Sequence, residues 1–104
     1  MRTRWLGATG VRVPEIAVEG EGVELIADNR VRVGDEEWPA LIARPPLDVD
    51  ELRAAHERGT PVVVAAADEG DVAAALERPE VASVVVPPER RELLELDLRR
   101  MKYG

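Results

Sequence analysis

The 104-residue sequence predicts a single mixed α/β domain (α+β in character), in which antiparallel hairpins precede a β-α-β-α-β-α unit with a short parallel sheet. Apolar and polar residues alternate through much of the first 38 residues, a period of two that is typical of half-buried strands. From residue 39 onward, short continuous apolar runs alternate with helical segments, which favours strands covered on both faces. We therefore expect a β-rich part over residues 1–38 and an α/β part over residues 39–104, packed together.

Strands of the N-terminal part are expected where Val, Ile or Leu recurs at every second position. These positions are Val11 and Val13, Ile16 and Val18, Val23 and Leu25, and Val31 and Val33. Gly20-Glu21-Gly22 supplies positive φ for a hairpin between the second and third pairs. Turns are also expected at residues 28–30 and 34–35. Because Pro14 cannot donate a backbone hydrogen bond, its strand should lie at an edge or begin there.

The α/β part is expected to contain strands at residues 40–43, 62–67 and 81–86. Parallel crossovers are right-handed in nearly all cases, so both connecting helices should cover one face of the sheet unless the strand order reverses.

Two helices are expected between these strands. Asp48 is the predicted N-cap of the first, with Glu51 at a capping-box spacing, and Gly59 ends it. His56 is expected on its apolar face. Asp68 is the predicted N-cap of the second helix, which runs over residues 69–78.

A third helix is predicted over residues 89–102. At about 100° per residue, its large apolar side chains span roughly 200° of arc. They are Leu93, Leu94, Leu96, Leu98 and Met101. This arc is wider than the roughly 100° that a one-sided surface helix needs. Part of the face is therefore expected to dock on another chain, unless the small sheet simply encloses more of the helix. Trp5 and Trp38 are the other expected partner-binding residues, although both can equally be core.

Charge and composition disfavour several classes of partner. The formal charge is −7 and there are only three aromatic residues, which leaves neither the basic field nor the stacking platform that nucleic acids require. No apolar run approaches the roughly 20 residues of a membrane span. The first five residues are not followed by the apolar region of a signal peptide. We expect a cytoplasmic or virion location.

Candidate catalytic residues are few. His56 is the only His, Ser83 is the only Ser and lies in an apolar run, and there is no Cys. The acidic residues at 48–51 and 68–71 have the spacing of helix caps, and no Gly-rich phosphate loop follows a strand. We expect no enzyme activity, no cofactor and no metal. Arg44, at the carboxyl end of a predicted strand, is a candidate anion contact beside Asp68, and an ordinary salt bridge between the two is the alternative.

The stretches TPVVVAAAD (60–68), DVAAALE (71–77) and VVVP (84–87) make residues 39–104 resemble the second half of a response-regulator receiver, a flavodoxin-like domain. That family has an Asp after the strand that here ends at Arg44, a hydroxyl after the strand ending at Ala67, and a Lys where this chain has Val86. The resemblance therefore implies a docking domain without phosphotransfer. A five-stranded parallel sheet would favour it.

WLG (5–7), VRVP (11–14) and WPALIARP (38–45) make residues 1–45 similar to the opening of small virion proteins of tailed phages. This resemblance implies a capsid-, neck- or tail-associated component that docks on a neighbouring subunit.

We therefore expect a non-enzymatic subunit that binds other protein chains, in a homo- or hetero-oligomer. A degenerate receiver-like docking domain is the alternative, and a small-molecule binder at the strand ends is a third candidate.

Overall fold

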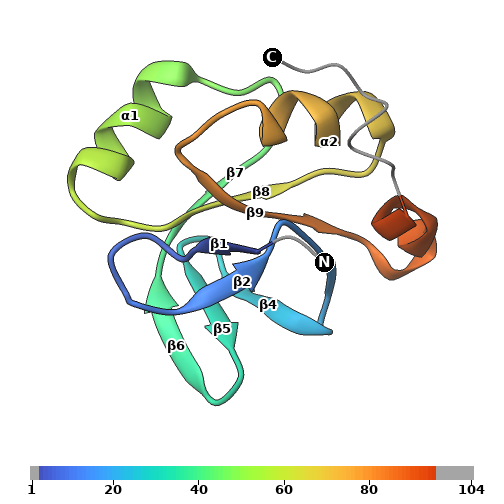
Figure 1. Cartoon of the computed structure of the whole chain (residues 1–104), viewed down its shortest axis with the longest axis horizontal. Coiled ribbons are helices and arrows are strands. Elements are labelled where there is room, and N and C mark those ends of the chain that lie inside the picture. The colour runs from blue at the N-terminus through green and yellow to red at the C-terminus, as the bar shows by residue number, and fades with distance from the viewer. Residues whose placement is uncertain (1–2, 96–104) are drawn as a thin grey trace.

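The computed structural model describes residues 3–95, which form one extended sheet with helices on one face and a two-stranded hairpin on the other (Figure 1). In chain order the elements are β1 (Thr3–Trp5), β2 (Arg12–Pro14), β3 (Ile16–Glu19), β4 (Gly22–Ala27), β5 (Arg30–Val33), β6 (Glu36–Pro39), β7 (Leu41–Ala43), α1 (Val49–Glu57), β8 (Val62–Ala65), α2 (Glu69–Leu76), β9 (Val81–Val86) and the 3-10 helix η1 (Pro88–Glu95). The predicted mixed α/β class is confirmed.

The large sheet has seven strands in the order β6-β5-β4-β3-β9-β8-β7. The run β4-β3-β9-β8-β7 is parallel, whereas β4, β5 and β6 are joined by antiparallel pairing. The expected turns between β4 and β5 and between β5 and β6 are present. Strands of the two parts thus meet at the β3–β9 pair and make one continuous sheet.

Two apolar clusters hold the layers together. On one face, Leu52 of α1, Val72 of α2 and Leu93 of η1 pack with the alternate strand residues. On the other face, Leu6 and Val13 of the β1–β2 hairpin pack over the sheet. Both connecting helices therefore cover the same face, as the handedness rule predicts.

Helix capping follows the sequence closely. Oδ1 of Asp48 accepts hydrogen bonds from the backbone N–H groups of Asp50 (3.0 Å) and Glu51 (3.2 Å). Oδ1 of Asp68 accepts one from Asp71 N–H (2.8 Å). These bonds satisfy donors that a helix N-terminus leaves free. Within residues 3–95, the helices are all too short or too polar to span a bilayer.

The predicted hairpin at Gly20-Glu21-Gly22 is wrong. Both glycines have positive φ (83° and 98°), but the chain loops round so that β4 leaves parallel to β3, with Val18 opposite Gly22. On its other side, β3 pairs with β9 over residues 16–18, and the strand is buried on both faces. Ile16 and Val18 alternate in the sequence as if β3 had one exposed face. Ala17 between them is nevertheless also buried, on the hairpin side, because β3 lies in the interior of the sheet.

Two further expectations are corrected at the helices. Residues 88–95 form a 3-10 helix with non-helical φ/ψ angles at Arg90, instead of the start of an α-helix. Arg91 pairs with Glu21, which ties η1 to the β3–β4 loop. His56 is exposed, not on the apolar face, because the buried face of α1 consists of Leu52 and Ala55.

Candidate binding groove

The β1–β2 hairpin sorts its side chains between an inner and an outer face. In β1, Arg4 points inward, whereas Thr3 and Trp5 are exposed. In β2, Val13 is buried and pairs with Arg4, while the exposed Arg12 lies directly opposite Trp5. Successive side chains of a strand alternate between faces. The hairpin therefore presents one polar anchor to the protein and one aromatic-cationic pair to solvent.

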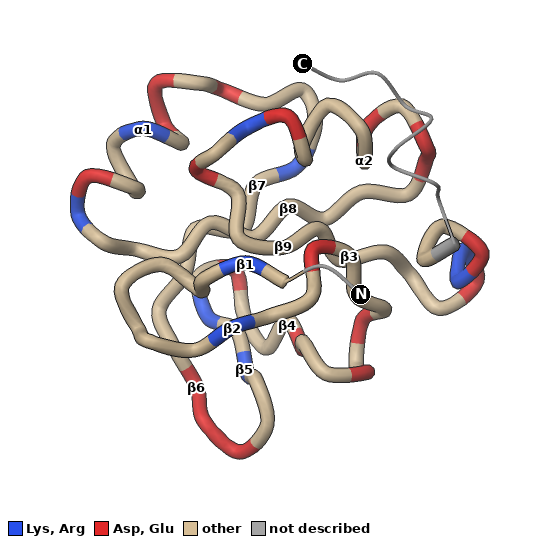
Figure 2. Tube along the Cα trace, in the orientation of Figure 1, with Lys and Arg blue, Asp and Glu red and all other residues tan. Residues whose placement is uncertain are grey.

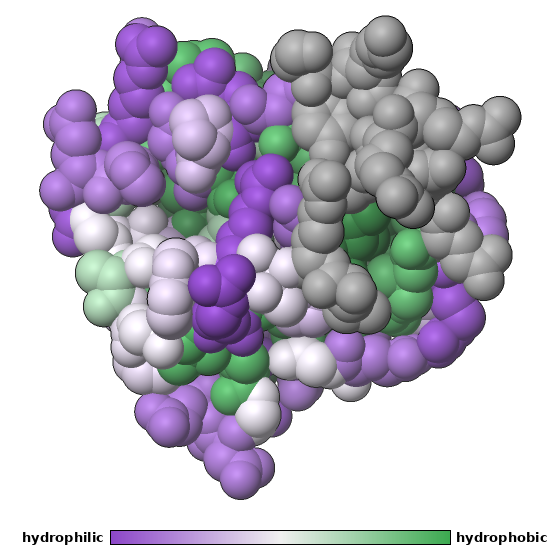
Figure 3. All heavy atoms as spheres, in the orientation of Figure 1, coloured by the Kyte–Doolittle hydropathy of each residue, from purple (hydrophilic) through white to green (hydrophobic). Residues whose placement is uncertain are grey.

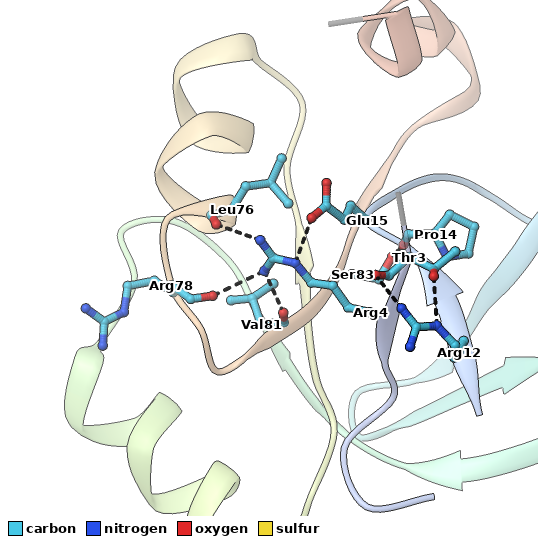
Figure 4. Close-up of polar contacts among 9 residues, drawn as sticks. All are labelled: Thr3, Arg4, Arg12, Pro14, Glu15, Leu76, Arg78, Val81 and Ser83. Carbon is cyan, nitrogen blue, oxygen red and sulfur yellow. Dashed lines mark hydrogen bonds and ion pairs between the residues drawn. The ribbon is translucent and has the colours of Figure 1, made fainter. Parts of the chain in front are cut away.

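The inward anchor is Arg4, whose guanidinium joins three elements (Figure 4). Its Nη2 donates to the carbonyl oxygen of Leu76 at the end of α2 (2.8 Å). Its Nη1 donates to the carbonyl oxygens of Arg78 (3.3 Å) and Val81 (2.9 Å). A cation at a helix C-terminus stabilises carbonyls that have no partner within the helix. Arg4 thereby fixes β1 against the α2–β9 loop.

Glu15 balances the charge of Arg4. Arg4 Nε donates to Glu15 Oε1 at 3.0 Å, and the Glu15 side chain is only 10% exposed. Its other oxygen, Oε2, is buried and has no hydrogen-bond partner among the described residues. Nearby, the fully buried Ser83 donates from Oγ to the carbonyl oxygen of Pro14 (2.7 Å). These polar contacts attach the hairpin to β9 at a defined position.

The outward pair is Trp5 and Arg12. The Arg12 guanidinium carbon lies 4.7 Å from the centroid of the Trp5 ring, within the range of a cation–π contact. Arg12 Nε also donates to Thr3 Oγ1 (2.8 Å), and Nη2 donates to the Thr3 carbonyl oxygen (3.1 Å). Trp5 remains 57% exposed, more than any other large hydrophobic side chain in the part of the chain that is described. The guanidinium is thus held over the ring of a largely exposed Trp5.

This pair borders a groove of about 520 Å³. One wall is the hairpin, with Trp5 and Arg12. The opposite wall consists of His56 at the end of α1 and of the loops that precede β8 and β9, including Thr60 and Glu80. In the view of Figure 3, most of the described surface is hydrophilic or near neutral, with hydrophobic areas between. The groove therefore combines an aromatic face with hydrogen-bonding groups.

Close backbone packing shapes the floor of the groove. Gly7 has a φ of +53°, and a Cβ there would lie 2.8 Å from Pro61 N and 2.9 Å from Gly59 O. Ala8 N–H donates to the same Gly59 carbonyl oxygen (3.3 Å). The β1–β2 loop thus lies directly on the α1–β8 loop, which only a residue without a side chain permits.

Charge in the groove is mixed. Arg12 forms no salt bridge with any carboxylate of residues 3–95. Glu80 is held by Arg78, whose Nε and Nη2 donate to its two oxygens (3.1 and 3.0 Å). Partial burial acts to raise the pKa of Glu80, but a backbone hydrogen bond and Arg78 lower it overall. The carboxylate of Glu80 is therefore already paired, whereas Arg12 is available.

The other predicted partner-binding residues lie elsewhere. Trp38, in β6, is half-buried against the hairpin-side cluster, and its Nε1 is buried without a described partner. Leu93 is 2% exposed and Leu94 is partly buried, both against the helix-side cluster of their own chain. Leu96, Leu98 and Met101 lie outside the described residues.

The strand-end site is not polar. Arg44 and Asp68 are both exposed, and no salt bridge joins them within the described ranges. A hollow of about 280 Å³ does lie at the carboxyl ends of β8 and β9, but neither residue lines it. Its walls are mainly apolar, from Leu25, the alanines after β8 and the two prolines after β9.

No set of three or more His, Asp or Glu side chains within residues 3–95 is arranged to hold a metal ion. Searches against protein-family models, curated proteins and solved structures each found no match. The groove must therefore be interpreted from its own chemistry.

Sequence reasoning identified Trp5 but not the groove around it. Arg4 and Glu15 were missed, because their contacts join residues 11 to 77 positions apart. One local signal was available: if Leu6 is buried, strand alternation places Arg4 on the inner side and Trp5 on the outer side.

Proposed function

We propose that this chain is a non-enzymatic, protein-binding subunit of a larger assembly, and that it engages its partner through the Trp5–Arg12 groove. The observation that carries the proposal is the 57% exposure of Trp5 beside a groove of about 520 Å³. Trp and Arg are enriched among the residues that dominate protein–protein binding. Both stand here on the outer face of one hairpin.

The energy available from Trp5 is sufficient for an anchor. With about 250 Å² for a whole Trp side chain, 57% exposure leaves about 140 Å² to be covered. At about 25 cal/mol per Å², covering this area contributes about 3.5 kcal/mol before the entropic costs of association. One residue of this kind is the usual centre of an interface.

Arg12 adds directional contacts at a small cost in conformational entropy. Its Nε and one Nη2 hydrogen are bonded to Thr3, and its guanidinium carbon lies over the Trp5 ring. The Nη1 group has no hydrogen-bond partner among the described residues. An Arg side chain that is already ordered loses less rotamer entropy when a carboxylate or carbonyl binds to it.

The receiver-like alternative receives mixed support. Five neighbouring strands are parallel, as that alternative expects. However, β9, the last strand of the β-α-β-α-β unit, lies in the middle of the sheet beside β3. In the flavodoxin-like order 2-1-3-4-5 the last strand lies at the edge. We therefore prefer the assembly subunit, and the phage virion setting remains a prediction from the resemblance of residues 1–45.

Selection from a library of short random peptides tests the proposal. Wild-type protein should enrich specific peptides, and these should bind W5A at least about tenfold more weakly, since the loss of an anchor costs about 1.4 kcal/mol or more. E57A, which changes an exposed side chain of α1 outside the groove, is the matched control and should bind as the wild type does. Equal binding to W5A and wild type, or no enrichment at all, would contradict the proposal.

A further inference from the structure

We propose that the occupant of the Trp5–Arg12 groove is the β5–β6 turn of a second copy of this chain, so that copies associate head to tail. This inference rests on the proposed function and names the partner of the same groove. It is based on charge complementarity between two surfaces of one molecule. One is the groove with its available guanidinium, and the other is an acidic, protruding turn.

The turn carries three consecutive carboxylates, Asp35, Glu36 and Glu37, all exposed. Figure 2 shows this acidic stretch at the tip of the β5–β6 hairpin, which extends away from the helical layer. Gly34 at the turn would meet nothing within 4 Å if it carried a Cβ. The tip is therefore unobstructed around Gly34 by the rest of the described chain.

Within residues 3–95, only one of the three carboxylates forms a salt bridge. Glu37 pairs with Arg32 (3.1 Å) and Arg30 (3.5 Å). Asp35 and Glu36 take part in no salt bridge within residues 3–95. They are thus available to an external cation.

The groove offers the matching group. The Nη1 of Arg12 points to no described acceptor, and the Trp5 face beside it is open. The whole chain carries 21 acidic and 14 basic residues, so most contacts between two copies would be repulsive. A contact that places Asp35 and Glu36 against Arg12 brings opposite charges together and is therefore electrostatically favourable.

Such a contact joins two different surfaces, so an associated pair still has one free groove on one copy and one free tip on the other. Head-to-tail contacts of this kind produce rings or filaments and not two-fold dimers. Association should therefore extend beyond the dimer as protein concentration rises. Because the contact is ionic and exposed at its rim, it should weaken with salt, whose screening length is about 10 Å at 0.1 M.

Light scattering with size exclusion, over increasing protein concentration at low salt, tests the inference with charge-reversal variants. The wild type should grow in mass, whereas R12E and E36R should each remain monomeric. An equimolar mixture of R12E and E36R should recover association, because the mixture contains both the native Arg12–Glu36 pair and the reversed pair. R44E and E57R make the same changes of charge outside both surfaces and should associate as the wild type does.

Three results would overturn the inference: a wild type that stays monomeric at millimolar concentration, association that R12E or E36R leaves intact, or a mixture that does not recover. If the wild type stays monomeric but Trp5-dependent peptides are still selected, the self-contact is wrong and the proposed function stands, with a different protein in the groove. If W5A leaves peptide binding unchanged, the proposed function itself fails.

Discussion

Arg4 should be the side chain on which the position of the hairpin depends most. The substitution Arg4→Met keeps most of the aliphatic stem but removes the donors to Glu15 and to three backbone carbonyl oxygens. The Glu15 carboxylate, 10% exposed, is then left without its cation. The substitution does not stabilise the unfolded state to a comparable extent, so the lost interactions lower the free energy of unfolding.

The size of the effect follows from the burial of the pair. Breaking a buried ion pair by removing one partner costs about 3–5 kcal/mol. Arg4 retains 23% side-chain exposure, so we expect the lower end, about 3 kcal/mol. For a domain of this size, that corresponds to a melting temperature lower by roughly 10–20 °C.

Urea and thermal unfolding, followed by circular dichroism, measure this loss. Arg12→Met is the matched control, because it removes the same group from the exposed face of the same hairpin and should cost less than about 1 kcal/mol. The double variant Arg4→Met/Glu15→Leu should be more stable than Arg4→Met alone, since it no longer buries an unpaired carboxylate. The reasoning is refuted if Arg4→Met costs no more than Arg12→Met, or if the double variant recovers nothing.

Three other predictions concern stability, each measured by the same unfolding assays. Gly7→Ala should cost at least about 1 kcal/mol more stability than Gly34→Ala. Both positions have positive φ, but only at Gly7 would the Cβ meet backbone atoms, at 2.8 and 2.9 Å. Equal costs would contradict this packing. Ser83→Ala should cost about 1–2 kcal/mol, because the partly buried carbonyl of Pro14 loses its donor, and an unchanged midpoint would show that the bond is unimportant. Hydrogen bonding to Arg32 lowers the pKa of Glu37 in the native state. The ionised Glu37 therefore contributes to folding stability above the ordinary Glu pKa of about 4.3, and this contribution is lost as pH falls through the lower native pKa. Glu37→Gln should therefore flatten the decrease in stability below about pH 4.3, and an unaltered profile would be evidence against this linkage.

The parts of the fold that local signals specify were predictable. Asp48 and Asp68 accept hydrogen bonds from the first turns of α1 and α2, as their positions before the apolar pattern indicate. Gly59 has a φ of +75° and ends the turn after α1. The continuous apolar runs became β7, β8 and β9, a parallel set. Each of these features depends on residues within a few positions of one another.

Features that depend on distant residues were not predictable. The place of β3 in the sheet depends on β9, in which Val84 pairs with Ile16 across 68 positions. The inward side of the hairpin depends on carbonyl groups of Leu76 and Val81 that accept from Arg4. Strand alternation can place Arg4 on the inner side, but a single sequence carries no local mark of the β3–β9 pairing or of the carbonyls that accept from Arg4. The groove, which exists only because the hairpin lies on these loops, could not be predicted for the same reason.

The central claim is that a partner covers the open face of Trp5, and the accessibility of that indole tests it most directly. Because the chain has only two Trp residues, Trp38→Phe leaves Trp5 as the single reporter, and it also removes a buried Nε1 that has no described partner. Quenching of this fluorescence by acrylamide should be strong in the monomer. We predict that it falls several-fold when the protein associates or binds a selected peptide. A complex in which Trp5 is quenched as readily as in the monomer would contradict the account.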